Sequence, residues 1–349
     1  MNEPGPDFSR RSEYSVDGMW RLQPELIRQF IETEPDYSAL CREIAYILSK
    51  WVEEEGVEVA TITWRSKSLT SFLHKTQRKV YLNPLADLMD RAGVRVVCHY
   101  GSDCERVEGI ISSYFDVLET VDKKEALGTD RFGYGAKHFL VRLNDRSVGA
   151  RYDDLRGLVC EIQVRSVIQD AWAVLHHHLF YKDEDRTPTQ LLRSANSLAA
   201  ILETVDDGFE SLRRQRDEYV RQIRESRADR ERFLLYELTV ESFTEYLQWR
   251  FPGRPLERSE GQLRRILADL DKQRFRLLSD LDRVVDRFSG EIEEIGRMVD
   301  PIDLESQEVR PSVYDVVWAA ALSDANMLSG FGLPLHWRDA LCRVQGKSA

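Results

Sequence analysis

Apolar residues recur every three or four positions between Met19 and about Glu55, which is the spacing of amphipathic helices. They form two sets, Leu22, Leu26, Ile27 and Phe30, then Leu40, Ile44, Ile47, Leu48 and Trp51. Pro35 stands between the sets, and a proline interrupts helical hydrogen bonding. Residues 1–55 are therefore predicted to be an N-terminal helical segment of two helices behind a mostly polar lead-in.

The apolar pattern changes to that of strands after residue 56. Runs rich in β-branched side chains predict strands at residues 57–64, 93–100, 133–143 and 157–165. Helical patterns occupy residues 103–114 and 167–181. Strands alternating with helices predict an α/β or α+β domain on one mixed sheet, and we assign it to residues 56–185.

Past Asp185 the pattern is helical throughout. Apolar residues keep a helical period across 191–212 and again across 263–295, and both blocks are flanked by dense mixed charge. Residues 186–349 are therefore predicted to form a helical C-terminal extension, with Tyr236–Trp249 as a small separate unit. We interpret the extension as a regulatory or oligomerisation element, so a second copy or a regulatory protein is the partner expected there.

Composition narrows the class of protein. The net charge of −11 argues against broad nucleic-acid binding, so any phosphate site must be a local cationic patch. The five cysteines form no CxxC pair, which favours a reducing compartment over a disulfide framework or a zinc knuckle. Without an apolar leader or a membrane-length apolar run, a cytoplasmic location and no membrane partner are expected.

The first group of candidate site residues follows the strand predicted at 57–64. Arg65 and Lys67 end that strand, and Ser68 is placed to cap a helix that reaches about Lys79. Ser71 and Lys75 would share one face of that helix. A strand that feeds a capped basic helix is a place for a polyphosphate, although a solvated basic helix would carry the same charges.

The second group is Asp90 and Arg95, at the mouth of the apolar strand that begins near Gly93. A carboxylate in this position can hold Mg²⁺, which prefers one or two carboxylates together with phosphate oxygens. An arginine beside it can stack on a base or contact phosphate. The alternative is that Asp90 is a turn residue or cap.

The third group is carried by the strand around Phe132-Gly133-Tyr134-Gly135-Ala136-Lys137-His138. A strand period of two places Tyr134, Ala136 and His138 on one face. The tyrosine ring offers a platform for a base, and the glycines permit close approach of a ligand. Packing of Tyr134 and His138 within a core is the alternative.

The fourth group is an alternation of polar and apolar residues in the last predicted strand. Glu161, Gln163 and Arg165 share one face, opposite Ile162 and Val164. A polar face is costly in a covered sheet unless it lines a site, but it is ordinary on a solvated sheet. His177 lies on the helix predicted next.

In this order and spacing the four groups resemble the synthetase domain of the RelA/SpoT family, the enzymes that make the alarmones pppGpp and ppGpp. The resemblance covers roughly residues 55–185, and its most specific part is Glu161-Ile162-Gln163-Val164-Arg165 with the following Trp172-Ala173. It implies a nucleotidyltransferase-like α+β domain and a GTP pyrophosphokinase activity that moves the β,γ-diphosphate of ATP to the 3′-hydroxyl of GTP or GDP.

The resemblance also implies a role for each matching residue. On the donor side, Arg65 and Arg95 would sandwich the adenine of ATP. The phosphates of ATP would contact Lys67, Ser71 and Lys75.

On the acceptor side, Asp90 and Glu161 would ligate Mg²⁺, and Glu161 would help to deprotonate the attacking 3′-hydroxyl. Tyr134 would stack on the acceptor base. The residues that would support the acceptor are His138, Gln163, Arg165 and His177.

Two departures from the family pattern leave the acceptor open. Gly135, Ala136 and Lys137 replace the usual long polar residue, serine and aliphatic residue, and Val174 replaces a frequent glutamate. A toxin-like relative that modifies the 3′ end of tRNA is therefore an alternative, with a basic groove built from Lys123, Lys124, Arg131 and Lys137. A non-enzymatic helical scaffold is a second alternative. No His-Asp dipeptide of the family's hydrolase domain occurs, so a synthesis-only protein is expected.

Overall fold

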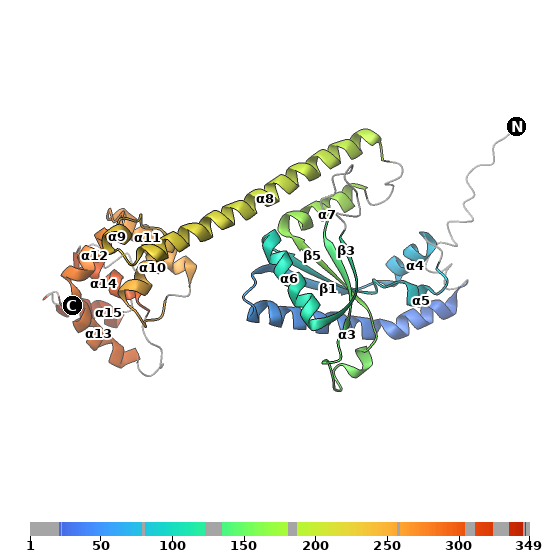
Figure 1. Cartoon of the computed structure of the whole chain (residues 1–349). Coiled ribbons are helices and arrows are strands. Elements are labelled where there is room, and N and C mark those ends of the chain that lie inside the picture. Colours follow the sequence, from blue (N-terminus) through green and yellow to red (C-terminus); the bar gives the residue numbers. More distant parts are fainter. Residues whose placement is uncertain are drawn as a thin grey trace. The chain divides into compact units, whose positions relative to one another are not determined.

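One mixed sheet organises the N-terminal part of the chain, seen in a computed structural model (Figure 1). Its strands are β1 (Val59–Ser66), β2 (Ala92–Cys98), β3 (Phe115–Asp122), β4 (Lys137–Leu143) and β5 (Cys160–Ser166). The five strands lie in the order β1-β2-β5-β4-β3. Strands β2 and β5 run parallel, and the other neighbours are antiparallel. The predicted α+β class with a mixed sheet is thus confirmed, although β3 was not predicted.

The structure describes residues 21, 23–78, 81–122, 135–180, 187–256, 259–303, 311–323, 335–344 and 346. The chain divides into two compact units, Met1–Leu212 and Arg213–Ala349. The first unit extends past residue 185, where the composition changes, because its last helix is tied back to the sheet. Asp206 accepts a hydrogen bond from Ser166 Oγ at 2.7 Å, and Glu210 accepts one from Ser102 Oγ at 3.0 Å.

The helices of the first unit are α3 (Pro24–Glu54), α4 (Leu69–Arg78), α5 (Pro84–Asp87), α6 (Gly101–Tyr114), α7 (Val167–Phe180) and α8 (Thr189–Ser226), which continues into the second unit. A short 3-10 helix spans Asp153–Leu155. Helices α3 and α6 cover one face of the sheet, where their apolar side chains join Val94, Val96, Ile162 and Val164 in one core.

The prediction of two helices before residue 55 was wrong, because Pro35 lies inside the single helix α3. The part of α3 before the proline packs Ile27 and Phe30 against Phe72 of α4, and the part after it packs against the sheet. Burial on both sides offsets the hydrogen bond that Pro35 cannot donate.

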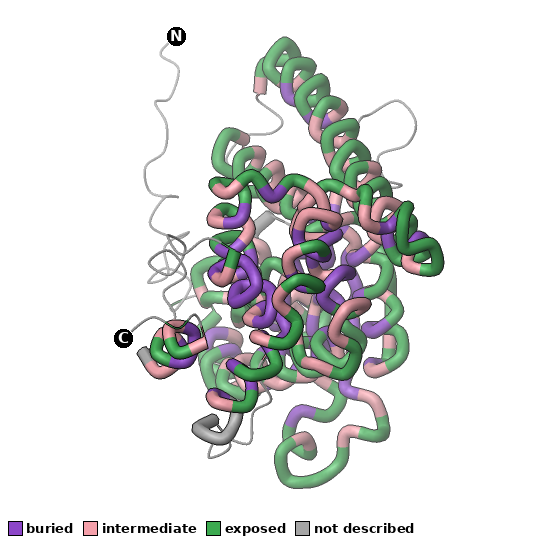
Figure 2. The backbone as a smooth tube through the Cα atoms, turned by 90° about the vertical axis from the view of Figure 1, so that its left-hand side faces the viewer, coloured by how far each residue is buried: buried purple, intermediate pink, exposed green. Residues whose placement is uncertain are grey.

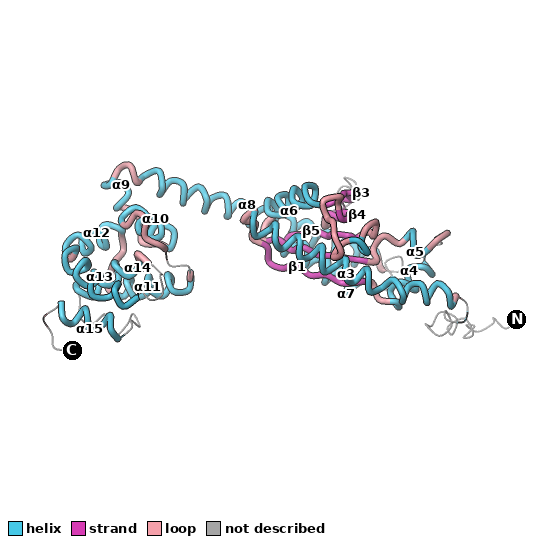
Figure 3. The backbone as a smooth tube through the Cα atoms, turned by 90° about the horizontal axis from the view of Figure 1, so that it is seen from below, coloured by secondary structure: helices cyan, strands magenta, loops and turns pink. Residues whose placement is uncertain are grey.

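The second unit is helical, as the fold prediction stated. Its further helices are α9 (Arg230–Leu234), α10 (Val240–Arg250), α11 (Glu260–Lys272), α12 (Leu278–Arg287), α13 (Ser289–Asp303), α14 (Val313–Ser323) and α15 (Leu335–Val344). The block predicted at 263–295 is divided among three of them. Figure 3 shows helices and loops in the described part of this unit. An isolated β-bridge pairs Glu237 with Leu277.

The core of the second unit is its own. Phe243, Tyr246 and Trp318 are fully buried in it, and the buried positions lie on the inward sides of the helices (Figure 2). The predicted separate unit at Tyr236–Trp249 is instead part of this core. No helix in the described ranges of the chain has the length and apolarity that crossing a bilayer requires.

Candidate active site

The polar face of the sheet, opposite α3 and α6, collects the side chains singled out in the sequence. The parallel pairing of β2 with β5 sets Gly93 beside Glu161 and Arg95 beside Gln163. The antiparallel pairing of β1 adds Arg65 at the level of Gly93. Paired residues on neighbouring strands point to the same face, so these positions face one side of the sheet.

Two lysines hold the carboxylate of Asp90, which lies two residues before the first residue of β2. Lys67 Nζ lies 2.8 Å and Lys75 Nζ lies 2.6 Å from Asp90 Oδ2. Lys75 is carried by α4, whose first turn is capped as predicted, because Ser68 Oγ accepts the backbone N–H of Ser71 at 3.3 Å. The sequence therefore builds a cationic cradle around one carboxylate.

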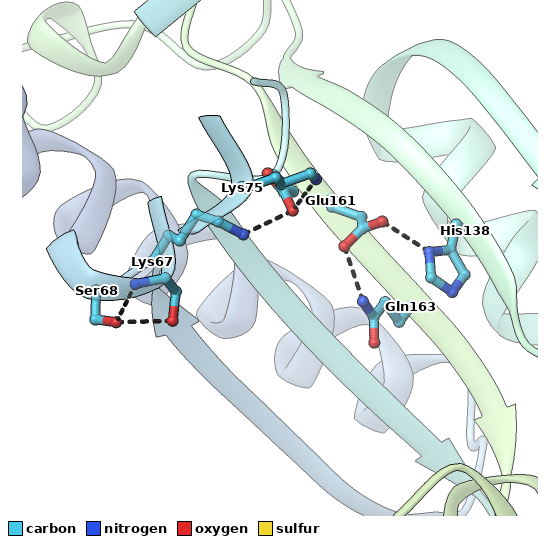
Figure 4. A network of polar contacts seen from close by, with 8 residues as sticks. Lys67, Ser68, Lys75, His138, Glu161 and Gln163 are labelled. Carbon is cyan, nitrogen blue, oxygen red and sulfur yellow. Dashed lines mark hydrogen bonds and ion pairs between the residues drawn. The ribbon is translucent and has the colours of Figure 1, made fainter. Parts of the chain in front are cut away.

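Glu161 lies between this cradle and the side chains of His138 and Gln163 (Figure 4). His138 Nδ1 donates to Glu161 Oε1 at 2.7 Å, and Gln163 Nε2 donates to Glu161 Oε2 at 2.8 Å. Both oxygens of the carboxylate are thus oriented by strands β4 and β5. The structure brings Glu161, His138 and Gln163, three of the predicted site residues, into direct contact.

The charge of Asp90 acts on Glu161, and the pKa of each carboxyl group is nevertheless below its ordinary value. Burial raises the pKa of Glu161, but the hydrogen bond and charge of His138 and the hydrogen bond of Gln163 outweigh it and lower that pKa overall, against a smaller opposing effect of the Asp90 charge. Burial likewise raises the pKa of Asp90, and the two lysines more than reverse it. Both groups are therefore ionised at neutral pH, within one site.

These shifts predict a stability that depends on acid pH. A carboxyl group whose pKa is lowered by folding stabilises the folded state above its ordinary pKa of about 4, and this contribution is lost as the pH falls through the lowered value. We expect hydrogen exchange of β2 and β5 amides, corrected for intrinsic rates, to show this loss below about pH 4. At pH 7 these amides should be less protected in Asp90→Asn than in wild type. At pH 3 the difference in protection between the two proteins should be smaller. An equal difference at both pH values would contradict the prediction.

Asp90 also meets a requirement for a magnesium ligand. Its Oδ1 atom is buried without a hydrogen-bond partner, while both lysines contact Oδ2. Within the described ranges no cluster of three or more His, Cys, Asp or Glu side chains could hold a metal. Two carboxylates completed by phosphate oxygens are what Mg²⁺ prefers, so Asp90 and Glu161 fit that ion.

Arg95 and Arg165 both contact the carboxylate of Asp170, which was not among the predicted site residues. Asp170 Oδ1 lies 3.2 Å from Arg95 NH1 and 3.4 Å from Arg165 NH1. Arg165 is buried, and its NH2 donates to Gln163 Oε1 at 2.7 Å. The signal for Asp170 was its place in the first turn of the helix that follows the polar strand.

Three of the other predicted site residues lie at exposed positions. The side chains of Arg65 and Ser71 are exposed, and His177 is exposed in the last turn of α7. Tyr134 lies outside the described residues. Lys137, which was assigned to a basic groove, instead forms a 2.7 Å ion pair with Glu108 of α6, away from the face of His138.

Two ionised carboxylates and two lysines thus lie on the polar side of the sheet of an α+β domain. In a comparison with known families, residues 64–186 match the model described as "Region found in RelA / SpoT proteins". The predicted family resemblance is confirmed, and with it the prediction of an enzyme.

Two similar curated proteins are named GTP pyrophosphokinases. GTP pyrophosphokinase YwaC of Bacillus subtilis (strain 168) is 27% identical over 158 residues, which are 44% of this chain and 73% of the relative. GTP pyrophosphokinase YjbM of the same strain is 26% identical over 156 residues, 43% of this chain and 72% of the relative.

Solved structures of similar proteins include two from Bacillus subtilis. Small alarmone synthetase 2 has a TM-score of 0.46 and 22% identity, and the match covers 53% of this chain and 97% of that one. Small alarmone synthetase 1 has a TM-score of 0.46 and 21% identity, and the match covers 55% of this chain and 99% of that one.

Proposed function

We propose that the chain transfers the β,γ-diphosphate of ATP to the 3′-hydroxyl of GTP or GDP and so makes pppGpp or ppGpp. One observation carries the proposal. Asp90 and Glu161, far apart in sequence, lie in one site beside two lysines within a RelA/SpoT region. The curated relatives named GTP pyrophosphokinase support a guanine nucleotide as the acceptor.

The chemistry follows from the charges of the site. The acceptor 3′-oxygen attacks the β-phosphorus of ATP, the bond from that phosphorus to the α–β bridging oxygen breaks, and AMP leaves. Glu161, ionised and held by His138 and Gln163, accepts the proton of the 3′-hydroxyl. Lys67 and Lys75 can exchange their contacts with Asp90 for phosphate oxygens and neutralise the charge of the transferred group. Bound Mg²⁺, held by Asp90 and Glu161, would polarise the phosphates and align them.

Positions on the donor side fit a purine nucleotide. Arg65 and Arg95 flank the mouth of β2 on neighbouring strands, with Gly93 between them at the level of Arg65. An added Cβ at Gly93 would lie 3.7 Å from the carbonyl oxygen of Arg65, an ordinary contact, so this glycine leaves room for a ligand rather than relieving a clash. Guanidinium groups stack on planar rings, which supports adenine between the two arginines.

Product analysis of the purified full chain tests the proposal. The protein is incubated with Mg²⁺ and ATP labelled at the γ-phosphate, in separate reactions with GTP, GDP, ADP and tRNA. Label in a 3′-pyrophosphorylated guanine nucleotide, with AMP formed in equal amount, is the expected result. If all label that leaves ATP enters inorganic phosphate or pyrophosphate, the proposed transfer is wrong.

The same reactions test the two alternatives. Label at the 3′ end of tRNA, with none in a guanine nucleotide, would assign the toxin-like activity. The engagement of Lys137 with Glu108 removes one of the four cations on which that reading depended, and the other three lie outside the described residues. Absence of transfer to any acceptor would favour the helical scaffold.

A further inference from the structure

A continuous chain of polar contacts crosses the site from β2 to β5 by way of α7. Asp170 Oδ1 lies 3.2 Å from Arg95 NH1 and 3.4 Å from Arg165 NH1. Arg165 NH2 donates to Gln163 Oε1 at 2.7 Å, and Gln163 Nε2 donates to Glu161 Oε2 at 2.8 Å. A residue proposed to stack on the donor base is thus connected to the proposed catalytic carboxylate.

The contact with Arg165 decides how the Gln163 amide is turned. A guanidinium group can only donate hydrogen bonds, so the oxygen of the amide must face Arg165. The NH₂ group of Gln163 must then face Glu161, which as a carboxylate can only accept. If the amide were reversed, its NH₂ group would face the donors of Arg165 and its oxygen would face the carboxylate of Glu161, and neither hydrogen bond could form. Arg165 therefore fixes the hydrogen bond that orients Glu161.

Arg165 itself acts from inside the protein. Its side chain is 7% exposed, so it is poorly placed to contact a substrate, which is the role that the family resemblance implied. A buried guanidinium needs a counter-charge. Burial lowers the pKa of Arg165, and the neighbouring charge of Arg95 lowers it further. The carboxylates of Asp170 and Glu161 oppose both effects, and of the two it is Asp170 that contacts Arg165 directly.

The start of α7 holds Asp170 in place. Ser166 Oγ accepts the backbone N–H of Gln169 at 3.1 Å, and Gln169 Oε1 accepts the backbone N–H of Ser166 at 2.9 Å, a reciprocal capping box. Asp170 follows in the first turn, where the helix dipole favours a negative charge. The capping box therefore fixes the helix turn from which the Asp170 side chain reaches Arg95 and Arg165.

We propose that Asp170 is a positioning residue that couples the donor side of the site to Glu161, through Arg95 on one side and Arg165 and Gln163 on the other. This inference rests on the proposed function. When a purine donor stacks on Arg95, the contact of Arg95 with Asp170 is broken. The carboxylate of Asp170 then pairs with Arg165 alone. The Arg165–Gln163–Glu161 chain is then held more firmly at the moment when Glu161 is needed.

Asp170→Asn separates this role from a merely structural one. Without the charge of Asp170, Arg95 is released, and binding of a non-hydrolysable ATP analogue, measured by calorimetry, should tighten about two- to fivefold. The kcat for transfer should nevertheless fall about 10- to 100-fold, because Glu161 loses its orientation, as for other residues that hold a reactive group. Asp170→Glu keeps the charge and should restore part of kcat.

Two further variants keep the test decisive. Asp170→Asn removes the carboxylate that contacts the buried Arg165, so Arg165→Met is combined with it to remove both charges of that contact, and this pair should fold and keep the loss of kcat. Gln163→Leu in the Asp170→Asn background should add little further loss, because both changes break one chain. Asp153→Asn, an exposed aspartate of the 3-10 helix, is the matched control with unchanged kcat.

The outcomes distinguish this inference from the proposed function. Wild-type protein that makes no pyrophosphorylated product would remove the proposed function, whereas the calorimetric comparison of the ATP analogue would still be readable. Weaker analogue binding together with lower kcat in Asp170→Asn, or unchanged values of both, would overturn the coupling. Additive losses in the combination with Gln163→Leu would overturn it as well.

Discussion

Glu161→Gln should lower kcat for diphosphate transfer by at least about 10³-fold, because an amide cannot accept the proton of the 3′-hydroxyl. The change keeps the shape of the side chain. His138 and Gln163 can still lie beside it, so the fold should be retained, with a thermal unfolding midpoint close to that of wild type. The measurement is the initial rate of AMP and product formation at saturating ATP and GTP.

Glu108→Gln is the matched control for this prediction. Glu108 is also a glutamate paired with a basic side chain, and its side chain is 22% exposed against 21% for Glu161, but it lies on α6 and pairs with Lys137. Its rate should stay within about twofold of wild type, as expected for loss of a surface ion pair. A Glu161→Gln enzyme that retained a tenth of the wild-type rate would show that another group takes the proton.

Asp90→Asn has the second large expected effect, and the effect has two opposite parts. The kcat with Mg²⁺ should fall about 10³-fold, because the carboxylate proposed to bind the cation is lost. Binding of ATP in the presence of a chelator should instead tighten about three- to fivefold, because Lys67 and Lys75 no longer pair with Asp90 and are free for phosphate.

The initial rate of AMP formation measures the fall in kcat, and calorimetry with ATP, with and without Mg²⁺, measures the change in binding. In wild-type protein Mg²⁺ should strengthen ATP binding, and in Asp90→Asn this gain should disappear. Asp87→Asn, which removes an exposed carboxylate that accepts the backbone N–H of Asn83, is a nearby control and should keep the Mg²⁺ effect. Equal gains from Mg²⁺ in wild type and Asp90→Asn would rule out Asp90 as a ligand.

The strands that carry the site could be predicted because their patterns are local. Glu161, Gln163 and Arg165 alternate with Ile162 and Val164, and a period of two fixes which side chains share a face. Strand β3 could not be found in this way. It begins at Phe115 directly after α6 ends at Tyr114, without a turn residue, and its burial pattern shows one buried position at the edge of the sheet.

What could not be predicted depends on contacts between distant segments. From the sequence alone, Pro35 predicts the end of a helix. Only the burial of side chains on both sides of it explains why the helix continues. Asp170 reads as an ordinary residue of a first helical turn, and its partners appear only when α7 is placed against β2 and β5. Local propensity is overridden in the first case by packing, and in the second the information lies in the tertiary arrangement.

The position of β5 has a consequence for how this protein matures. It is the last of the described strands in sequence, yet it lies in the middle of the sheet, between the neighbouring pairs β1–β2 and β3–β4. Those pairs can form early as local hairpin-like structures, but they can join only after β5 has been synthesised and inserted. A nascent or truncated chain that stops before Cys160 thus lacks the strand that joins the two pairs and carries Glu161, so we expect activity only after translation has passed that strand.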